Sequence, residues 1–148
     1  MSAKLHLCGP DALPRLEPMV ADCHAEMGMA SDAEYRAAAL RPLLDGSPYG
    51  ALYLIGPERS PVGYLAVTFS WSLEFGGLEA MLDEIWIRPA VRGRGMAGDA
   101  LDALIGALGP TGVTAISLEA ERGSTAERLY ARQGFEARAT FMVLSRRL

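Results

Sequence analysis

The sequence predicts a mixed α/β fold of the α+β kind, with about seven strands in a central sheet and about four helices on its faces. Strand-like apolar runs alternate with segments of helical spacing along the whole chain, and no repeat, low-complexity run or linker interrupts them. Half of the 148 residues are hydrophobic and 7% are aromatic, as in an ordinary globular domain. This length can bury a core without disulfides or a structural metal. We therefore expect residues 1–148 to form a single domain.

The first third of the chain predicts one strand and two helices. Lys4 to Cys8 reads as a short strand, and Pro10-Asp11 opens a helix. The apolar residues of this helix recur at helical spacing: Leu13, Leu16, Val20, Cys23 and Met27. Ser31 and Glu34 have the spacing of a capping box, in which each side chain satisfies a backbone amide, so they start a second helix. Asp45 to Pro48 ends it.

The rest of the chain alternates strands and helices. Strand-like runs cover residues 51–55, 62–69 and 78–87, with turns at 56–61 and 76–77 and a stop at Pro89. Residues 95–108 have helical spacing and end at Gly109-Pro110, and 113–118 predict another strand. A second capping box, Ser124 to Glu127, opens a short helix to Arg132. Phe135 and residues 141–144 are predicted to supply the last two strands.

Charge and targeting features exclude several classes of partner. A net charge of −4 and a pI of about 5.2 argue against nucleic acid or an anionic membrane as the partner. No apolar run approaches the roughly 18–20 residues of a membrane span, and the first residues lack the pattern of a signal peptide. We expect a cytoplasmic location.

The two cysteines, Cys8 and Cys23, show no CxxC pairing, which predicts reduced thiols. Cys23-His24 could be half of a metal site, but His6 is the only other histidine. The alternative that we favour is a buried thiol beside a histidine on the helix surface. We expect no metal.

The segment from Ile85 to Ala97 carries the strongest functional signal, because a predicted strand runs into a glycine-rich turn that becomes a helix. The first turn of a helix leaves backbone N–H groups unpaired and carries partial positive charge, so it can bind an anion. Gly93, Gly95 and Ala97 would let a phosphate approach the backbone, and Arg92 and Arg94 add charge. The segment is neither a Walker loop nor a complete dinucleotide fingerprint. The competing interpretation is a glycine-rich turn with surface arginines.

Two motifs resemble the GNAT superfamily of N-acetyltransferases. Residues 92–97, Arg-Gly-Arg-Gly-Met-Ala, match its acetyl-CoA loop (Gln/Arg)-x-x-Gly-x-(Gly/Ala), and residues 126–135 match its Ala-x-x-Leu-Tyr-x-x-x-Gly-Phe segment. The resemblance covers essentially the whole chain. It implies a mostly antiparallel sheet and acetyl-CoA as co-substrate. Because family members often dimerise, a homodimer is a candidate assembly.

The resemblance also implies which residues hold the cofactor. The backbone of Ile85, Trp86 and Ile87 would contact the pantetheine arm in a gap where the strand splays from its neighbour, residues 113–118. The pyrophosphate would lie on the loop residues: Arg92, Gly93, Arg94, Gly95, Met96, Ala97 and Gly98. The family usually has an Asn seven residues before the tyrosine, where this chain has Gly123. Ser124 either takes over that cofactor contact or only caps the helix.

The same resemblance makes Tyr130 the candidate acid that protonates the sulfur; the alternative is a core tyrosine packed on Ala126. A lysine-like amine is neutral in only about one part in a few thousand at pH 7, so a base is useful. Asp83 and Glu84 are the candidates, and alternation predicts that they point to opposite faces, with Glu84 on the face of Trp86. Glu119 and Glu74 are further choices, and each carboxylate could instead be a solvated strand end. The oxyanion donor is expected among the backbone N–H groups of residues 85–87.

The leading hypothesis is therefore an acetyl-CoA-dependent N-acetyltransferase that acts on a primary amine of a small molecule or peptide. Because neither cysteine lies in a motif, we expect direct attack in a ternary complex without an acyl-enzyme. Acidic residues near the 76–77 turn, including Glu74 and Glu79, would favour a cationic amine if they line the acceptor site. The alternatives are an acyl-CoA-binding sensor without catalysis and an acetyltransferase of protein N-termini or lysines.

Overall fold

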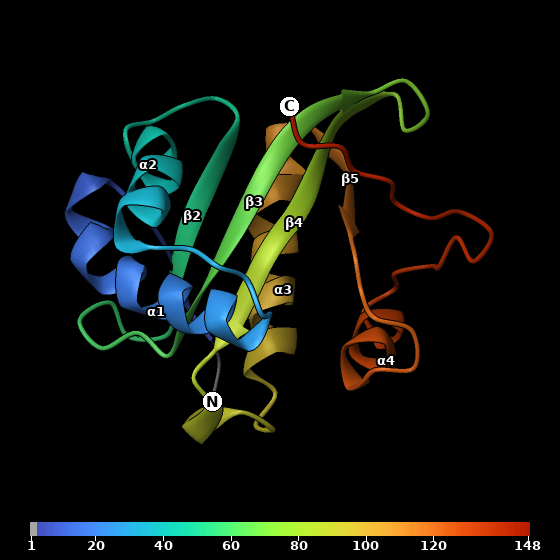
Figure 1. Ribbon diagram of the computed structural model, residues 1–148. Helices are drawn as coiled ribbons and strands as arrows, with labels where there is room; N and C mark the ends of the chain where they lie inside the picture. The colour runs from blue at the N-terminus through green and yellow to red at the C-terminus, as the bar shows by residue number, and fades with distance from the viewer. Residues whose placement is uncertain (1–2) are drawn as a thin grey trace.

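The computed structural model describes residues 3–148 and contains a five-stranded sheet in the order β1-β2-β3-β4-β5 (Figure 1). The strands are β1 Leu5–Leu7, β2 Gly50–Ile55, β3 Gly63–Ser72, β4 Gly77–Ile87 and β5 Val113–Leu118. The first four strands pair antiparallel with their neighbours, and β5 joins parallel to β4. The prediction of a mixed, mostly antiparallel sheet is confirmed.

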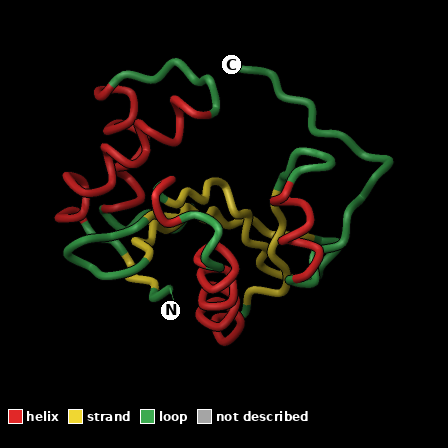
Figure 2. Tube along the Cα trace, turned by 90° about the horizontal axis from the view of Figure 1, so that it is seen from below, coloured by secondary structure: helices red, strands yellow, loops and turns green. Residues whose placement is uncertain are grey.

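Helices cover both faces of this sheet, and Figure 2 shows α3 on the side opposite to α1 and α2. Their bounds are α1 Leu13–Glu26, α2 Ala33–Leu44, α3 Met96–Leu108 and α4 Thr125–Arg132. Side chains of β3 alternate between the faces, so Tyr64 and Ala66 pack toward α1 and α2, while Leu65 and Val67 pack toward α3. This alternation explains why the middle strand is buried on both sides. Within residues 3–148, no helix is both long and apolar enough to pass through a membrane.

The predicted apolar face of α1 is confirmed in its middle and differs at its end. Leu16, Val20 and Cys23 are buried as expected. Met27 follows the last residue of α1 and is exposed. His24 was predicted on the helix surface, and this is wrong: the residue is only 8% exposed, because its ring bonds to side chains from two other segments.

Helix α2 begins one residue later than the capping box predicted. Asp32 is the N-cap, and its Oδ1 accepts a hydrogen bond from the Tyr35 amide at 2.8 Å. The Ser31 hydroxyl is not available for this role because it bonds to His24 and Arg36. The second capping box is confirmed: the Ser124 Oγ accepts from the Glu127 amide, and the Glu127 carboxylate accepts from the Gly123 amide.

The last two predicted strands are absent, so the sheet has five strands instead of about seven. Residues 133–148 contain no helix or strand, and Figure 1 shows them running past α4 and β5 as a loop. Phe141, Met142, Val143 and Leu144 are exposed. Phe135 instead packs edge-on against Tyr130, with ring centroids 5.9 Å apart. An apolar run forms a strand only where a neighbour accepts its backbone hydrogen bonds, and β5 pairs with β4 alone among the described residues.

Gly63 marks a close approach of β3 to β4. A Cβ at this position would overlap the carbonyl oxygen of Trp86 in the paired strand. We expect Gly63→Ala to lower the free energy of unfolding by about 2 kcal/mol, as overpacked sites do, and denaturant titration measures this. The control is Gly106→Ala on the exposed face of α3, where a Cβ meets no atom within 4 Å and stability should hold or rise. If both variants are equally stable, a Cβ at position 63 does not overlap the Trp86 carbonyl oxygen and the prediction is wrong.

Candidate functional site

The glycine-rich turn forms the start of α3 as an open set of backbone donors. Gly93 and Gly95 have φ values of 76° and 79°, a region that favours glycine. Gly95 is the N-cap of α3, and no side chain caps this end. No amide of residues 93–98 donates a hydrogen bond to any of the residues 3–148. A Cβ at either glycine would meet no atom within 4 Å, so the space beside both residues is open. This geometry fits an anion such as a diphosphate.

The two arginines of the turn have different surroundings. The Arg92 guanidinium bonds to both carboxylate oxygens of Glu26 at 2.8 and 2.9 Å and to the Ile87 carbonyl at 2.8 Å. Arg92 also lies over the Trp86 ring, 5.9 Å from its centroid. The Arg92 and Trp86 side chains bond to Glu26 and lower its pKa. Arg92 therefore ties the turn to the end of α1, whereas Arg94 is exposed and forms no ion pair within residues 3–148.

The expected splay between β4 and β5 is present. Their pairing runs from Leu78 opposite Val113 to Leu82 opposite Leu118 and then stops. β4 continues to Ile87, and residues 84–87 pair with β3 on one edge and with no described strand on the other. An unpaired strand edge offers backbone donors and acceptors to an extended ligand. The predicted contact residues Ile85, Trp86 and Ile87 lie on this stretch, which leads directly into the glycine-rich turn.

A cavity of about 180 Å³ lies beside this unpaired stretch. It is lined by Cys23, Met27, Leu82, Asp83, Glu84, Ile85, Leu118, Glu119 and Tyr130. The structure therefore brings together Tyr130, Asp83 and Glu84, the three predicted catalytic residues, from α4 and β4. Glu119 joins them. Glu74 does not line the cavity; it forms an ion pair with Arg138.

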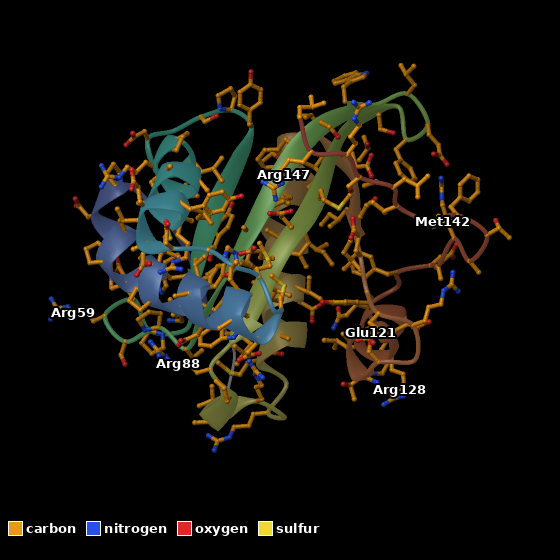
Figure 3. All side chains as sticks on the ribbon, in the orientation of Figure 1. Arg59, Arg88, Glu121, Arg128, Met142 and Arg147 are labelled. Carbon is orange, nitrogen blue, oxygen red and sulfur yellow. The ribbon has the colours of Figure 1, made fainter. Side chains whose placement is uncertain are left out.

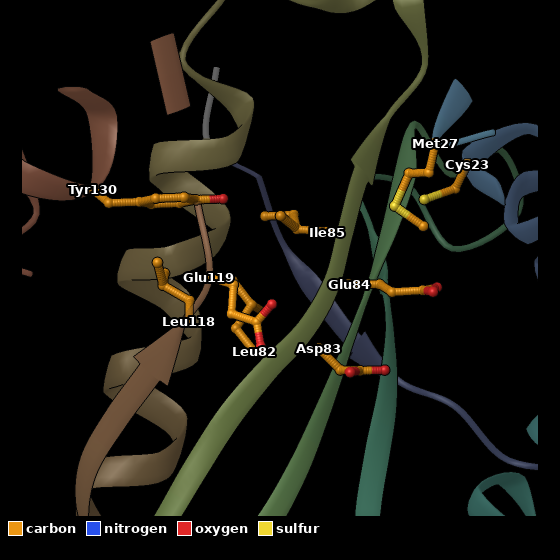
Figure 4. Close-up of a pocket in the computed structure, with 9 residues that line it drawn as sticks. All are labelled: Cys23, Met27, Leu82, Asp83, Glu84, Ile85, Leu118, Glu119 and Tyr130. Atoms are coloured by element: carbon orange, nitrogen blue, oxygen red, sulfur yellow. The ribbon is translucent and has the colours of Figure 1, made fainter. Parts of the chain in front are cut away.

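Tyr130 lies on the β5 side of the cavity. Figure 4 shows its hydroxyl pointing across the gap toward Ile85 and β4. The residue is 9% exposed, and burial raises the pKa of its hydroxyl. Tyr130 therefore keeps its proton throughout the neutral pH range, which a proton donor requires.

A β-bulge separates the two candidate bases. Ala66 lies opposite Glu84 and Val67 opposite Leu82, so Asp83 has no partner in β3. The prediction that Asp83 and Glu84 point to opposite faces is wrong, because the extra residue breaks the alternation. Figure 4 shows both carboxylates on the side of β4 nearer α1. The shared face of Glu84 and Trp86 is confirmed: Trp86 packs under α1, and Glu84 bonds to α1.

The two carboxylates differ in their partners. Glu84 accepts hydrogen bonds on both oxygens, from the Tyr64 hydroxyl at 2.7 Å and from the His24 Nε2 at 2.8 Å. Asp83 is exposed and bonds to no described side chain. Although the residue is exposed, neighbouring protein atoms displace part of the water around its carboxyl; this desolvation, and then the charges of Glu84 and Glu119, raise the pKa of Asp83.

Sequence reasoning missed His24 as part of this site. A lone histidine in a helix gives no pattern that distinguishes it from a surface residue. The only signal was the neighbouring Cys23, which the apolar pattern placed on the buried face of the helix. Residues 23 and 24 lie about 100° apart around a helix, so a wide buried face includes both. Both residues are buried here, so the covered face of α1 is wider at this point than the apolar pattern indicated.

The cysteines are poor nucleophiles. Burial raises the pKa of the Cys23 thiol, which lines the cavity, and raises that of Cys8 to about 11. The thiolate is the reactive form, so little of either is present at neutral pH.

Ser124 bonds within its own turn. Its Oγ accepts from the Glu127 amide at 3.1 Å, and its hydroxyl donates to the Glu121 carbonyl at 2.6 Å. These bonds account for the capping role that the sequence predicted.

Comparison with known proteins agrees with this geometry. Residues 15–135 match the acetyltransferase (GNAT) family, and the chain belongs to this family. The protein is thus an acetyltransferase by family and by fold, as the two sequence motifs predicted. No curated protein matches the chain.

Solved structures share the fold over nearly the whole chain. Integron cassette protein HFX_CASS3 from the mobile metagenome of Cole Harbour Salt Marsh has a TM-score of 0.84 and 28% identity, covering 97% of this chain and 90% of that chain. An aminoglycoside acetyltransferase from an uncultured soil metagenomic sample has a TM-score of 0.75 and 20% identity, covering 99% and 100%. A predicted acetyltransferase from Clostridium acetobutylicum, crystallised with acetyl-CoA, has a TM-score of 0.77 and 14% identity, covering 97% of this chain and 96% of that chain. At such identities the last two show the fold alone.

Proposed function

We propose that this protein transfers an acetyl group from acetyl-CoA to a primary amine of a small molecule or peptide, by direct attack in a ternary complex. The observation that carries the proposal is a continuous path: the open amides of residues 93–98, the unpaired edge of β4, and a cavity that Tyr130 enters. Residues 1–148 would act as one domain.

The residues along this path fit the parts of the cofactor. The amides at the start of α3 would hold the diphosphate, and the backbone of residues 85–87 would hold the pantetheine arm. Acetyl-CoA, when bound, supplies the acetyl group as an activated thioester. Backbone N–H groups of residues 85–87 would also stabilise negative charge on the carbonyl oxygen during transfer.

Proton transfers fall to side chains on the two sides of the cavity. Tyr130 holds a proton on its Oη and is the general acid for the departing sulfur. On the α1 side, a carboxylate of the Asp83–Glu84 pair removes a proton from the amine, directly or through water. Together with Glu119, these carboxylates give the cavity a negative lining that favours a cationic acceptor.

An acceptor screen tests the proposal. The purified protein is incubated with acetyl-CoA and with polyamines, aminoglycosides, and peptides that offer either a free N-terminus or a lysine, and the release of CoA is followed. Acetylation of at least one amine is expected. CoA binding without turnover on any amine would instead support a sensor, and turnover restricted to peptides would support a protein acetyltransferase.

The absence of an acyl-enzyme gives a prediction for Cys23, whose thiol lines the cavity. We expect Cys23→Ala to retain kcat within about threefold, because its protonated thiol is a poor nucleophile. Steady-state kinetics and mass spectrometry after incubation with acetyl-CoA alone measure this. Cys8→Ala, away from the cavity, is the matched control. An acetylated Cys23 peptide, or the loss of turnover in a folded variant, would contradict direct attack.

A further inference from the structure

Glu84 is the cavity end of a partly buried chain of hydrogen bonds. The Tyr64 hydroxyl donates to its Oε1 and the His24 Nε2 bonds to its Oε2. Tyr64 is fully buried and His24 is 8% exposed, and neither lines the cavity, whereas Glu84 does. Tyr64 and His24 therefore hold the Glu84 carboxylate on the side away from the cavity. Its remaining lone pairs are left for a group in the cavity.

The chain continues from His24 toward α2. The His24 Nδ1 lies 2.9 Å from the Ser31 Oγ, and the Arg36 Nη1 donates to the same Oγ at 3.2 Å. Arg36 is itself held by Glu17, whose Oε1 accepts from its Nε at 2.6 Å. A guanidinium only donates, so Ser31 accepts from Arg36 and can give its own proton to the His24 Nδ1.

One tautomer of His24 satisfies both of these partners. A neutral ring that accepts at Nδ1 carries its proton on Nε2, where an ionised Glu84 needs a donor. Ser31 and Arg36 thus orient the ring, and the ring orients the carboxylate, as outer partners orient a metal-bound or catalytic histidine. Asp83 has no such support, since it is an exposed bulge residue without a described hydrogen-bond partner.

We propose that His24 is a positioning residue that holds Glu84 as the base of the reaction, with Ser31 fixing the protonated nitrogen. The proposal rests on the acetyl transfer proposed above and selects Glu84 over Asp83 as the carboxylate that takes the amine proton. A base held in one geometry is effective because small displacements of a catalytic group cost about 10- to 100-fold in rate.

Two isosteric variants test the role of Nε2. His24→Gln places an amide N–H near the position of Nε2, whereas His24→Asn places one near Nδ1 and cannot reach Glu84. We expect the Gln variant to retain kcat within about fivefold and the Asn variant to lose about 10- to 100-fold, with the KM for acetyl-CoA unchanged in both. Equal losses in both variants, or full activity of the Asn variant, would overturn the proposal. His6→Gln on β1 is the control for histidine replacement.

Nitrogen NMR of the wild-type protein tests the tautomer without relying on activity. The chain has two histidines, so His6→Gln identifies the His24 signals. We expect the His24 Nε2 to carry a proton, and a shift of the Nδ1 signal in Ser31→Ala. A ring without a proton on Nε2, or no response to Ser31→Ala, would contradict the proposal. Absence of turnover in the wild type would instead refute the proposed function, while the NMR result would stand by itself.

Discussion

Replacing Gly95 by valine is expected to weaken the binding of CoA by about 10- to 100-fold. Gly95 has a φ of 79° at the N-cap of α3, and a β-branched residue in this region carries strain of about 1–3 kcal/mol. The backbone would relax toward negative φ, so the amides of residues 93–98 would no longer converge on one anion. Isothermal titration with CoA measures the change.

The matched control for this variant is Gly106→Val. Gly106 lies on the exposed face of the same helix, its φ is negative and a Cβ there meets no atom within 4 Å. Its CoA affinity should equal that of the wild type. If Gly95→Val also binds CoA with unchanged affinity, the turn is not the diphosphate site and the proposed function loses its main support.

Replacing Tyr130 by phenylalanine is expected to lower kcat by about 100-fold, near the lower end of the range for general acid–base catalysis. The ring would keep its contact with Phe135, so stability and the KM for acetyl-CoA should change little. Tyr49→Phe, at an exposed loop position, is the control. Unchanged kcat in Tyr130→Phe would remove its role as the acid.

The pH dependence of the wild type provides a second measurement for Tyr130. Burial raises its pKa, and a tyrosine with a raised pKa stays protonated to higher pH than usual. Loss of activity through ionisation of Tyr130 is therefore expected only above the ordinary tyrosine value of about 10. A decline near pH 8 that disappears in Tyr130→Phe would contradict this assignment.

The side chains of the cavity lie far apart in the sequence, which limits what motifs could predict. Tyr130 and the turn at residues 92–98 were found because each lies in a local motif. His24 and Ser31 were not, because their partners Glu84 and Arg36 belong to other elements. Figure 3 shows how densely side chains from α1 and α2 fill the space over the sheet, where these contacts form.

The errors in the fold have similar origins. The bulge at Asp83 reverses one side chain, and only the pairing of β3 with β4 reveals it. Phe141 to Leu144 have the composition of a strand, but β5 has no second partner among the described residues and the segment stays exposed.

The sequence by itself determined the element order as far as α4, the glycine-rich start of α3, and the class of enzyme. These properties depend on local chemistry: apolar spacing, capping residues, and glycines whose backbone conformation other residues avoid. Only the tertiary structure decided where β4 leaves β5, which carboxylate is held, and what Arg92 binds. Those features depend on contacts between distant segments, whose free energies are set by packing and register and leave no pattern in neighbouring residues.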